Sequence, residues 1–124
     1  MDIETLQKIV VDALEDIKAR DIEVIDTARL TSMFERIVIA SADSTRQTRA
    51  LANNVLEKVK DAGGSVLSIE GQDSGEWVLV DLGSIVVHIM QPAVRSYYNL
   101  EELWMTAPAG RKLAAAGAKP QSAG

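Results

Sequence analysis

Cysteine is absent from the 124-residue sequence, and histidine occurs once, at position 88. Without cysteine the chain forms no disulfide bond and offers neither a thiol nucleophile nor a thiolate metal ligand. A lone His88, flanked on its strand face only by Val86 and Met90, argues against a zinc site or a histidine-based triad. No catalytic residue, metal ligand or cofactor site is therefore predicted.

Long apolar runs are also missing, and no stretch approaches the roughly 20 residues that a membrane-spanning helix requires. The N-terminal segment MDIETLQ is acidic, where a secretory signal would carry positive charge and a mitochondrial presequence would carry arginines. Glycine-rich phosphate loops are missing too, because AGGSV at 62–66 closes a helical pattern instead of opening one. We expect a cytoplasmic protein without membrane contact.

Charge is unevenly distributed along the chain. Residues 1–104 carry 10 basic and 18 acidic side chains, a formal net charge of −8, whereas residues 105–124 carry three basic and no acidic ones. Arg95 is the single basic residue within 61–104, against seven acidic residues there. Such a surface repels nucleic acid and attracts a basic partner, although charge that merely keeps a small protein soluble gives the same pattern.

The spacing of apolar residues predicts the order of the elements. Repeats of three and four predict long amphipathic helices over 2–20 and within 41–64. Short β-branched runs predict strands at 22–26, 36–40 and 65–69, and two more strands lie in GEWVLVDLGSIVVHIM, residues 75–90. Pro92 is expected to end the last strand, and Asn99 to cap a short C-terminal helix in NLEELW. The prediction is one α/β domain over 1–104, with a mixed five-stranded sheet and the two long helices packed on one face.

The segment 75–90 reads as a β-hairpin. If Leu82-Gly83 is a two-residue turn, Trp77 faces His88 across the two strands. One face is then wholly aliphatic, and the other carries Trp77, Leu79, Asp81, Ser84, Val86, His88 and Met90. We expect Trp77 and His88 to be neighbours on the face away from the long helices, exposed to a partner, and Trp104 to be buried in a second small core.

Two acidic residues suggest an alternative. Asp21 and Glu23 in DIEV are two residues apart, so both side chains lie on one side of a strand. Nucleotidyl-transferring enzymes use this arrangement to hold two magnesium ions. Such enzymes also need a glycine-serine loop upstream, where this chain has an uninterrupted helical pattern. A dormant nucleotidyltransferase-like enzyme stays an alternative, testable by magnesium-dependent nucleotide binding. A homodimer that uses the Trp77 face on itself is another, testable by light scattering.

Six motifs together resemble the Iojap family, the bacterial ribosomal silencing factors. They are LTS at 30–32, VIAS at 38–41, STRQ at 44–47, GEWVLVDLG at 75–83, VVHIMQP at 86–92 and YYNLEELW at 97–104. The resemblance implies a nucleotidyltransferase-like topology without enzymatic activity. It also implies binding to the large ribosomal subunit through its protein number fourteen, with little direct nucleic-acid contact. The bound factor would block joining with the small subunit and so repress translation during starvation.

The resemblance carries over residue by residue. Its motif positions are Ser41, Arg46, Gln47, Trp77, Asp81, Gly83, His88, Arg95, Tyr98, Leu100, Glu101 and Trp104. Partner contacts are expected from Trp77, Leu79, Asp81, His88, Glu76, Arg95, Tyr98 and Arg46. Structural roles are expected for Gly83, Leu100 and Trp104. The chain departs from the family at Arg36-Ile37, where Tyr-Phe is usual, and at Ala42, where Gly is usual.

Residues 105–124, rich in Ala, Gly and Pro, are expected to form a flexible tail. They offer too few apolar groups to offset an ordering entropy of about 1 to 2 kcal/mol per residue. Deleting the residues after 106 should therefore leave the melting temperature, followed by circular dichroism, almost unchanged. A drop of many degrees would show instead that the tail docks on the domain.

Overall fold

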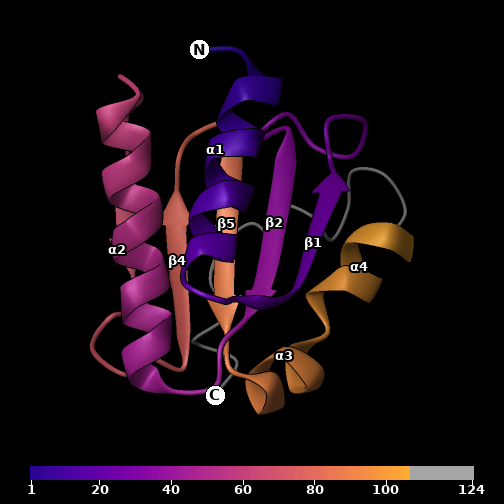
Figure 1. Cartoon of the computed structure of the whole chain (residues 1–124). Helices are drawn as coiled ribbons and strands as arrows, with labels where there is room; N and C mark the ends of the chain where they lie inside the picture. Colours follow the sequence, from indigo (N-terminus) through magenta and orange to yellow (C-terminus); the bar gives the residue numbers. More distant parts are fainter. Residues whose placement is uncertain (107–124) are drawn as a thin grey trace.

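The computed structural model describes residues 1–106, and the side chains up to residue 104. The expectations for the tail after residue 106 therefore lie outside the described residues, and α4 extends two residues into the predicted tail. The elements in chain order are α1 (Ile3–Asp16), β1 (Arg20–Asp26), β2 (Arg36–Ser41), α2 (Thr45–Asp61), β3 (Ser68–Glu70), β4 (Trp77–Asp81), β5 (Ile85–Met90), α3 (Pro92–Tyr98) and α4 (Leu100–Thr106) (Figure 1). No helix in this described part is long and apolar enough to cross a membrane.

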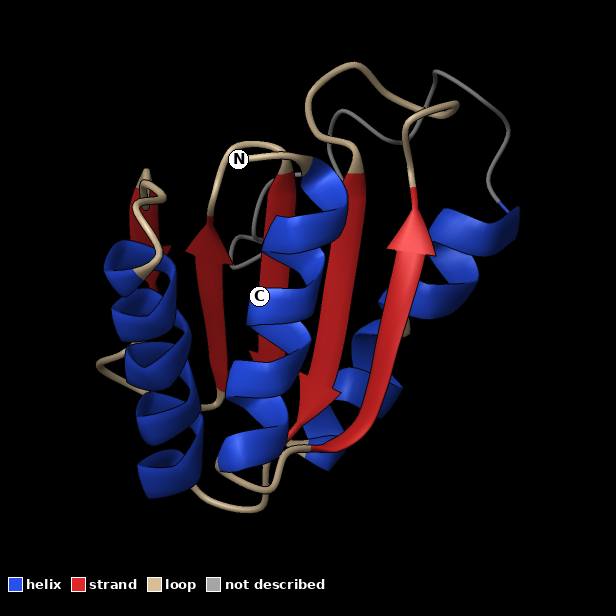
Figure 2. Ribbon diagram, turned by 45° about the horizontal axis from the view of Figure 1, so that its top comes forward, coloured by secondary structure: helices blue, strands red, loops and turns tan. Residues whose placement is uncertain are grey.

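One five-stranded sheet, in the order β1-β2-β5-β4-β3, organises the chain. The central pair β2 and β5 is parallel, and the other three pairs are antiparallel. Helices α1 and α2 lie side by side across one face of the sheet, and α3 and α4 lie on its other side (Figure 2). The predicted single α/β domain with a mixed sheet is confirmed.

Side-chain caps start both long helices. The Asp2 carboxylate accepts a hydrogen bond from the backbone N–H of Thr5 at 2.7 Å, and this bond lowers the pKa of Asp2. The Ser44 hydroxyl accepts one from the N–H of Gln47 at 3.1 Å, at the start of α2. Helix α1 ends at Asp16, earlier than predicted, because the chain turns at Lys18 with a left-handed φ of 66°.

The main core lies between the sheet and the two long helices. Small and β-branched side chains from alternate strand positions face the helices, as a period of two requires. The sheet contributes Val38, Ala40, Val78, Val80, Val87 and Ile89, and the helices contribute Leu6, Val10, Ala13, Leu14, Leu51, Ala52, Val55 and Val59. The predicted aliphatic face of the hairpin is thus confirmed.

The register of the β4–β5 hairpin differs from the prediction. Trp77 pairs with Met90, and Leu79 pairs with His88. The two turn residues are Gly83-Ser84, flanked by a 2.9 Å hydrogen bond from the N–H of Leu82 to the carbonyl of Ile85. Gly83 has a φ of +90°, which suits the first central position of a tight hairpin turn. The predicted Leu82-Gly83 turn is wrong, but a shift of pairing by two residues leaves every side chain on its predicted face.

Helix α3 was not predicted. Pro92 ends β5 as expected, but it also occupies the first turn of a helix, where its missing N–H removes no hydrogen bond. Asn99 ends α3 with a left-handed φ of 48°, and its side-chain oxygen accepts a 3.4 Å hydrogen bond from the N–H of Glu102 in α4. The predicted cap at Asn99 is confirmed, with an additional helix before it.

Candidate functional site

A second core fills the sheet face opposite the long helices. It contains Ile25, Phe34, Ile37, Ile39, Trp77, Leu79, Val86, Met90, Leu100 and Trp104. Trp104 is fully buried, and its ring meets that of Phe34 edge-on with centroids 5.2 Å apart. The predicted burial of Trp104, and the packing role of Leu100, are confirmed.

Trp77 and His88 belong to this second core. Trp77 is only 5% exposed and His88 only 1% exposed, so the prediction that they are open to a partner is wrong. The reason is α3, whose Val94 and Tyr98 pack against this cluster. The two residues are nevertheless neighbours on the predicted face, because the indole N–H of Trp77 donates a 3.0 Å hydrogen bond to Nδ1 of His88.

A row of aromatic rings leads from this pair to the surface. The Trp77 ring lies 4.9 Å from that of Tyr98, centroid to centroid. Tyr98 in turn meets Tyr97 edge-on at 4.9 Å. Tyr97 is 81% exposed, so the row runs from the buried His88 to an aromatic side chain in solvent.

The exposed end of this row borders a groove of about 510 Å³, called the aromatic groove below. Its lining residues are Ser74, Glu76, Trp77, Ala93, Val94, Tyr97 and Tyr98. The loop before β4 forms one wall and α3 forms the other. Glu76 is exposed, so an acidic rim adjoins the apolar walls.

Helix α2 holds the loop wall of the aromatic groove through backbone carbonyls. The Thr48 hydroxyl donates a 2.6 Å hydrogen bond to the carbonyl of Gly75, and Arg49 donates to the carbonyls of residues 72 and 73 at 2.7 Å each. Gly75 has a φ of +71°, and a Cβ there would lie 2.8 Å from the Cβ of Thr45. Only glycine lets the loop pass this close to α2.

The predicted contact residues do not form one cluster. Glu76, Trp77 and Tyr98 meet at the aromatic groove. Leu79 is buried in the second core, and Asp81 lies at the other end of β4, where its carboxylate accepts a 2.8 Å hydrogen bond from the N–H of Gly83 in the turn. The predicted structural role of Gly83 is confirmed by this turn.

The STRQ motif has two separable roles at the start of α2. Gln47 donates to the carbonyls of Ile17 and Lys18 at 3.1 and 3.2 Å, which ties α2 to the end of α1. Arg46 is exposed and forms no hydrogen bond or ion pair among the described residues. Arg46 is therefore free to meet a partner at the same end of the sheet as the aromatic groove.

Arg95 lies apart from the aromatic groove, in a polar hollow of about 440 Å³ on the other side of α3. It is 9% exposed, and it lies near Asp21 and Glu23, the predicted alternative metal ligands. No group of three or more metal-ligating side chains suited to holding an ion is found within the described residues.

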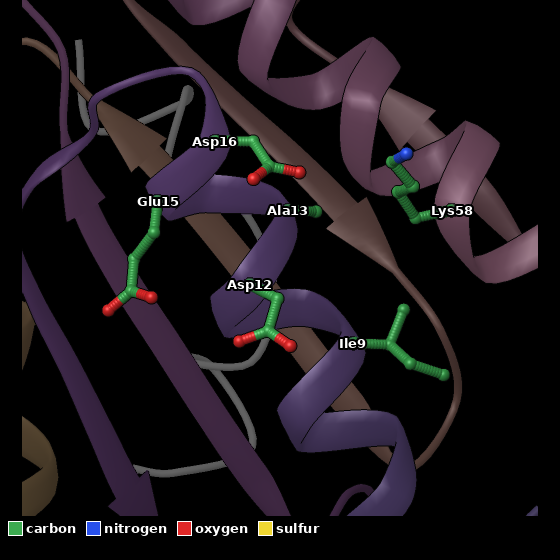
Figure 3. Close-up of a pocket in the computed structure, with 6 residues that line it drawn as sticks. All are labelled: Ile9, Asp12, Ala13, Glu15, Asp16 and Lys58. Carbon is green, nitrogen blue, oxygen red and sulfur yellow. The ribbon is translucent and has the colours of Figure 1, made fainter.

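A further hollow of about 440 Å³ opens between α1 and α2, on the far face of the sheet (Figure 3). Asp12 and Asp16 lie along α1, with Lys58 on α2. Asp12 already forms an exposed 3.0 Å ion pair with Lys8. These are solvated charges on helix surfaces, so the aromatic groove is the better candidate for partner binding.

The expected contact residues did not include Tyr97 and Val94, because no helix was predicted between Pro92 and Asn99. The signal was available: Pro92 suits a first helical turn, and Val94 and Tyr98 are four residues apart, as on one side of a helix. The segment is too short for helical periodicity alone to indicate a helix.

Comparison with known proteins gives consistent matches. The family model "Ribosomal silencing factor during starvation" matches residues 1–123. The protein named "Ribosomal silencing factor RsfS" of Chromobacterium violaceum is 51% identical over 99% of both chains. A crystal structure of a Chromobacterium violaceum protein, also 51% identical, superposes with a TM-score of 0.84 over 89% of this chain and 92% of that one. A mouse protein named "Mitochondrial assembly of ribosomal large subunit protein 1" is 36% identical over 76% of this chain and 42% of its own length. The resemblance inferred from the six motifs is confirmed.

The substitution Trp77→Phe tests the buried pair, because it keeps an aromatic ring but removes the indole donor. Leaving Nδ1 of His88 without this donor should lower the free energy of unfolding by about 1 to 3 kcal/mol. Tyr97→Phe is the matched control at an exposed ring and should change the free energy of unfolding by less than about 0.5 kcal/mol. Urea unfolding curves measure both, and equal stabilities would show that the hydrogen bond contributes nothing.

Proposed function

Because this chain belongs to the ribosomal silencing factor family, we propose that it binds the large ribosomal subunit in the cytoplasm, through protein number fourteen of that subunit. The bound protein blocks joining with the small subunit and represses translation during starvation. The observation that carries the proposal is the aromatic groove, which presents an exposed ring beside an acidic rim.

The shape and chemistry of the aromatic groove suit a protein partner. Tyr97 offers a large, amphipathic ring at the surface, and Tyr98 and Trp77 support it from below. Tyrosine and tryptophan are enriched among the residues that dominate binding energy at protein interfaces. The groove is mostly apolar, so a partner side chain that enters it gains free energy by leaving water. Tyr97 and Tyr98 are thus the proposed anchors, and Trp77 is the buried support beneath them.

The charge around the aromatic groove favours a basic protein over RNA. Glu70, Asp73 and Glu76 are all exposed in or next to the loop that forms one wall. Negative charge repels phosphate, whereas proteins that bind RNA carry basic surfaces. Opposite charge across an interface mainly speeds association and selects the partner. The preferred contact on a ribosomal subunit is therefore a protein surface, with little direct contact to nucleic acid.

Blocking subunit joining requires no chemistry from the bound protein. The two subunits meet over a defined surface, and a 13.4 kDa chain bound there occupies space that the small subunit needs. The effect then depends only on how much of the large subunit is occupied. This mechanism agrees with a site built of aromatic and acidic side chains instead of paired acids and bases.

The substitution Tyr97→Ala tests the groove as the contact. Loss of a central aromatic anchor should weaken binding to purified large subunits by about thirtyfold, equivalent to about 2 kcal/mol. Leu67→Ala, at another exposed side chain 67% open to solvent and outside the aromatic groove, is the control and should leave the affinity unchanged. Binding measured by biolayer interferometry distinguishes them. Equal affinities for the two variants would exclude the groove as the interface.

Sucrose-gradient profiles of mixed subunits test the silencing function itself. With saturating protein, the large and small subunits should sediment separately under conditions in which they otherwise join. Joining that is unchanged at saturation would refute the proposed function. Light scattering of the free protein shows whether it forms a homodimer, the alternative occupant of the groove.

A further inference from the structure

Helix α3 carries the outer wall of the aromatic groove, but it is anchored by a polar residue. Arg95 is its only buried residue. Val94 and Tyr98 are half-buried, and Tyr97 is exposed. The apolar contacts of α3 are thus partial, because Val94 and Tyr98 pack against the second core without being fully covered. The contacts of Arg95 add fixed directions to the placement of α3 that these half-buried side chains do not supply.

The guanidinium of Arg95 connects three other elements. Its Nε donates a 2.7 Å hydrogen bond to the carboxylate of Glu101 in α4. Its Nη1 donates to the hydroxyl of Ser41 at the end of β2 at 2.8 Å, and to the backbone carbonyl of Asp21 in β1 at 2.7 Å. A single side chain thus fixes α3 relative to α4, β1 and β2.

An irregularity in β1 makes one of these contacts available. The pairing of β1 with β2 shifts between Arg20 and Glu23, so Asp21 has no partner residue in the ladder. Asp21 adopts a left-handed φ of 51° there. Unpaired backbone groups at a bulge are free to bond elsewhere, and the carbonyl of Asp21 bonds to Arg95.

The hydrogen bonds of Arg95 fix the position of α3 more than they add to the stability of the fold. Burying an ion pair costs desolvation energy that offsets much of its attraction, so its replacement often changes stability little. The planar guanidinium, however, donates in fixed directions, which lysine does not reproduce. The polar hollow around Arg95 and the aromatic groove lie on different sides of α3, since the two sets of lining residues share none.

We propose that Arg95 is a positioning residue for partner binding: it fixes α3 so that Tyr98 stays against Trp77 and the aromatic groove keeps its shape. Arg95 itself makes no contact with the partner. This inference rests on the proposed function, and it differs from the contact role that the family resemblance implied for Arg95. With 9% of its surface exposed and its donors directed inward, Arg95 has little to offer a partner directly.

The test compares Arg95→Ala and Arg95→Lys with a matched arginine elsewhere. Arg36 is half-buried at the opposite end of β2 and bonds to Glu4 of α1 at 3.2 Å and to the side chain of Gln7. Each variant is measured for affinity to purified large subunits, for melting temperature, and for the ¹⁵N–¹H signal of the Trp77 indole. The chain has two tryptophans, so the Trp77 signal is assigned by its loss in Trp77→Phe.

Arg95→Ala should weaken binding at least tenfold and shift the Trp77 indole signal, because Tyr98 moves relative to the indole ring. Arg95→Lys should lie between Arg95→Ala and the unchanged protein. Arg36→Ala should leave the affinity within twofold and the indole signal in place, even where its melting temperature falls. If Arg95→Ala fails to fold, Glu101→Gln should show the same changes to a smaller degree.

Several results would overturn the inference. Weaker binding with an unmoved indole signal would mean that Arg95 contacts the partner directly. A shifted signal with unchanged affinity would mean that the position of α3 does not matter for binding. Equal losses in Arg36→Ala and Arg95→Ala, in proportion to melting temperature, would mean a general effect of stability. If the unchanged protein does not bind large subunits, the proposed function fails, but the indole signal still decides whether Arg95 holds Tyr98 against Trp77.

Discussion

The parallel pairing of β2 with β5 at the centre of the sheet is the constraint on which the rest of the structure depends. Every residue of β5 is buried, and so is every residue of β2 after Arg36. Strands buried on both faces need a layer on each side. Helices α1 and α2 supply one layer, and the connection at 27–35 together with α3 and α4 supplies the other. Helices α3 and α4 are thus part of the layer that the central strands require, and the proposed binding site is built on α3.

The two layers differ in composition, and this difference places the site. The layer under α1 and α2 is packed mainly with aliphatic side chains. The layer under α3 and α4 contains both tryptophans, Phe34 and the single histidine. The large rings nearest the sheet are covered, but the aromatic row continues from Trp77 through Tyr98 to the surface at Tyr97, which is 81% exposed. The site is therefore the incompletely covered edge of a core.

Local signals in the sequence were enough for most of the fold. The apolar repeats of three and four in the long helices and the alternation in β4 and β5 identified the elements and their faces, because each depends on neighbours in the chain. The alternation of side chains did not by itself fix the register of the hairpin. Two turns one residue apart, Leu82-Gly83 and Gly83-Ser84, sort the side chains identically, and glycine at the first central position decides between them.

The site was predicted less well, because burial at Trp77 and His88 depends on a helix from another part of the chain. A tryptophan with polar neighbours in its own hairpin looks exposed until α3 is known to cover it. The role of Arg95 was not predicted for the same reason. Its partners Asp21 and Ser41 are distant in sequence, and only the fold brings their oxygens to one guanidinium.

The loop before β4 is held by its backbone, since Thr48 and Arg49 bind carbonyl groups that every amino acid possesses. Besides Gly75, the side chain that holds this loop is that of Ser74, whose hydroxyl accepts a 3.3 Å hydrogen bond from the N–H of Glu76. Residues 72, 73 and 76 can consequently change their side chains without moving the wall that they form. A lineage could then change the charge and hydrogen-bonding pattern presented to a diverging partner, one substitution at a time, while the scaffold beneath stays intact.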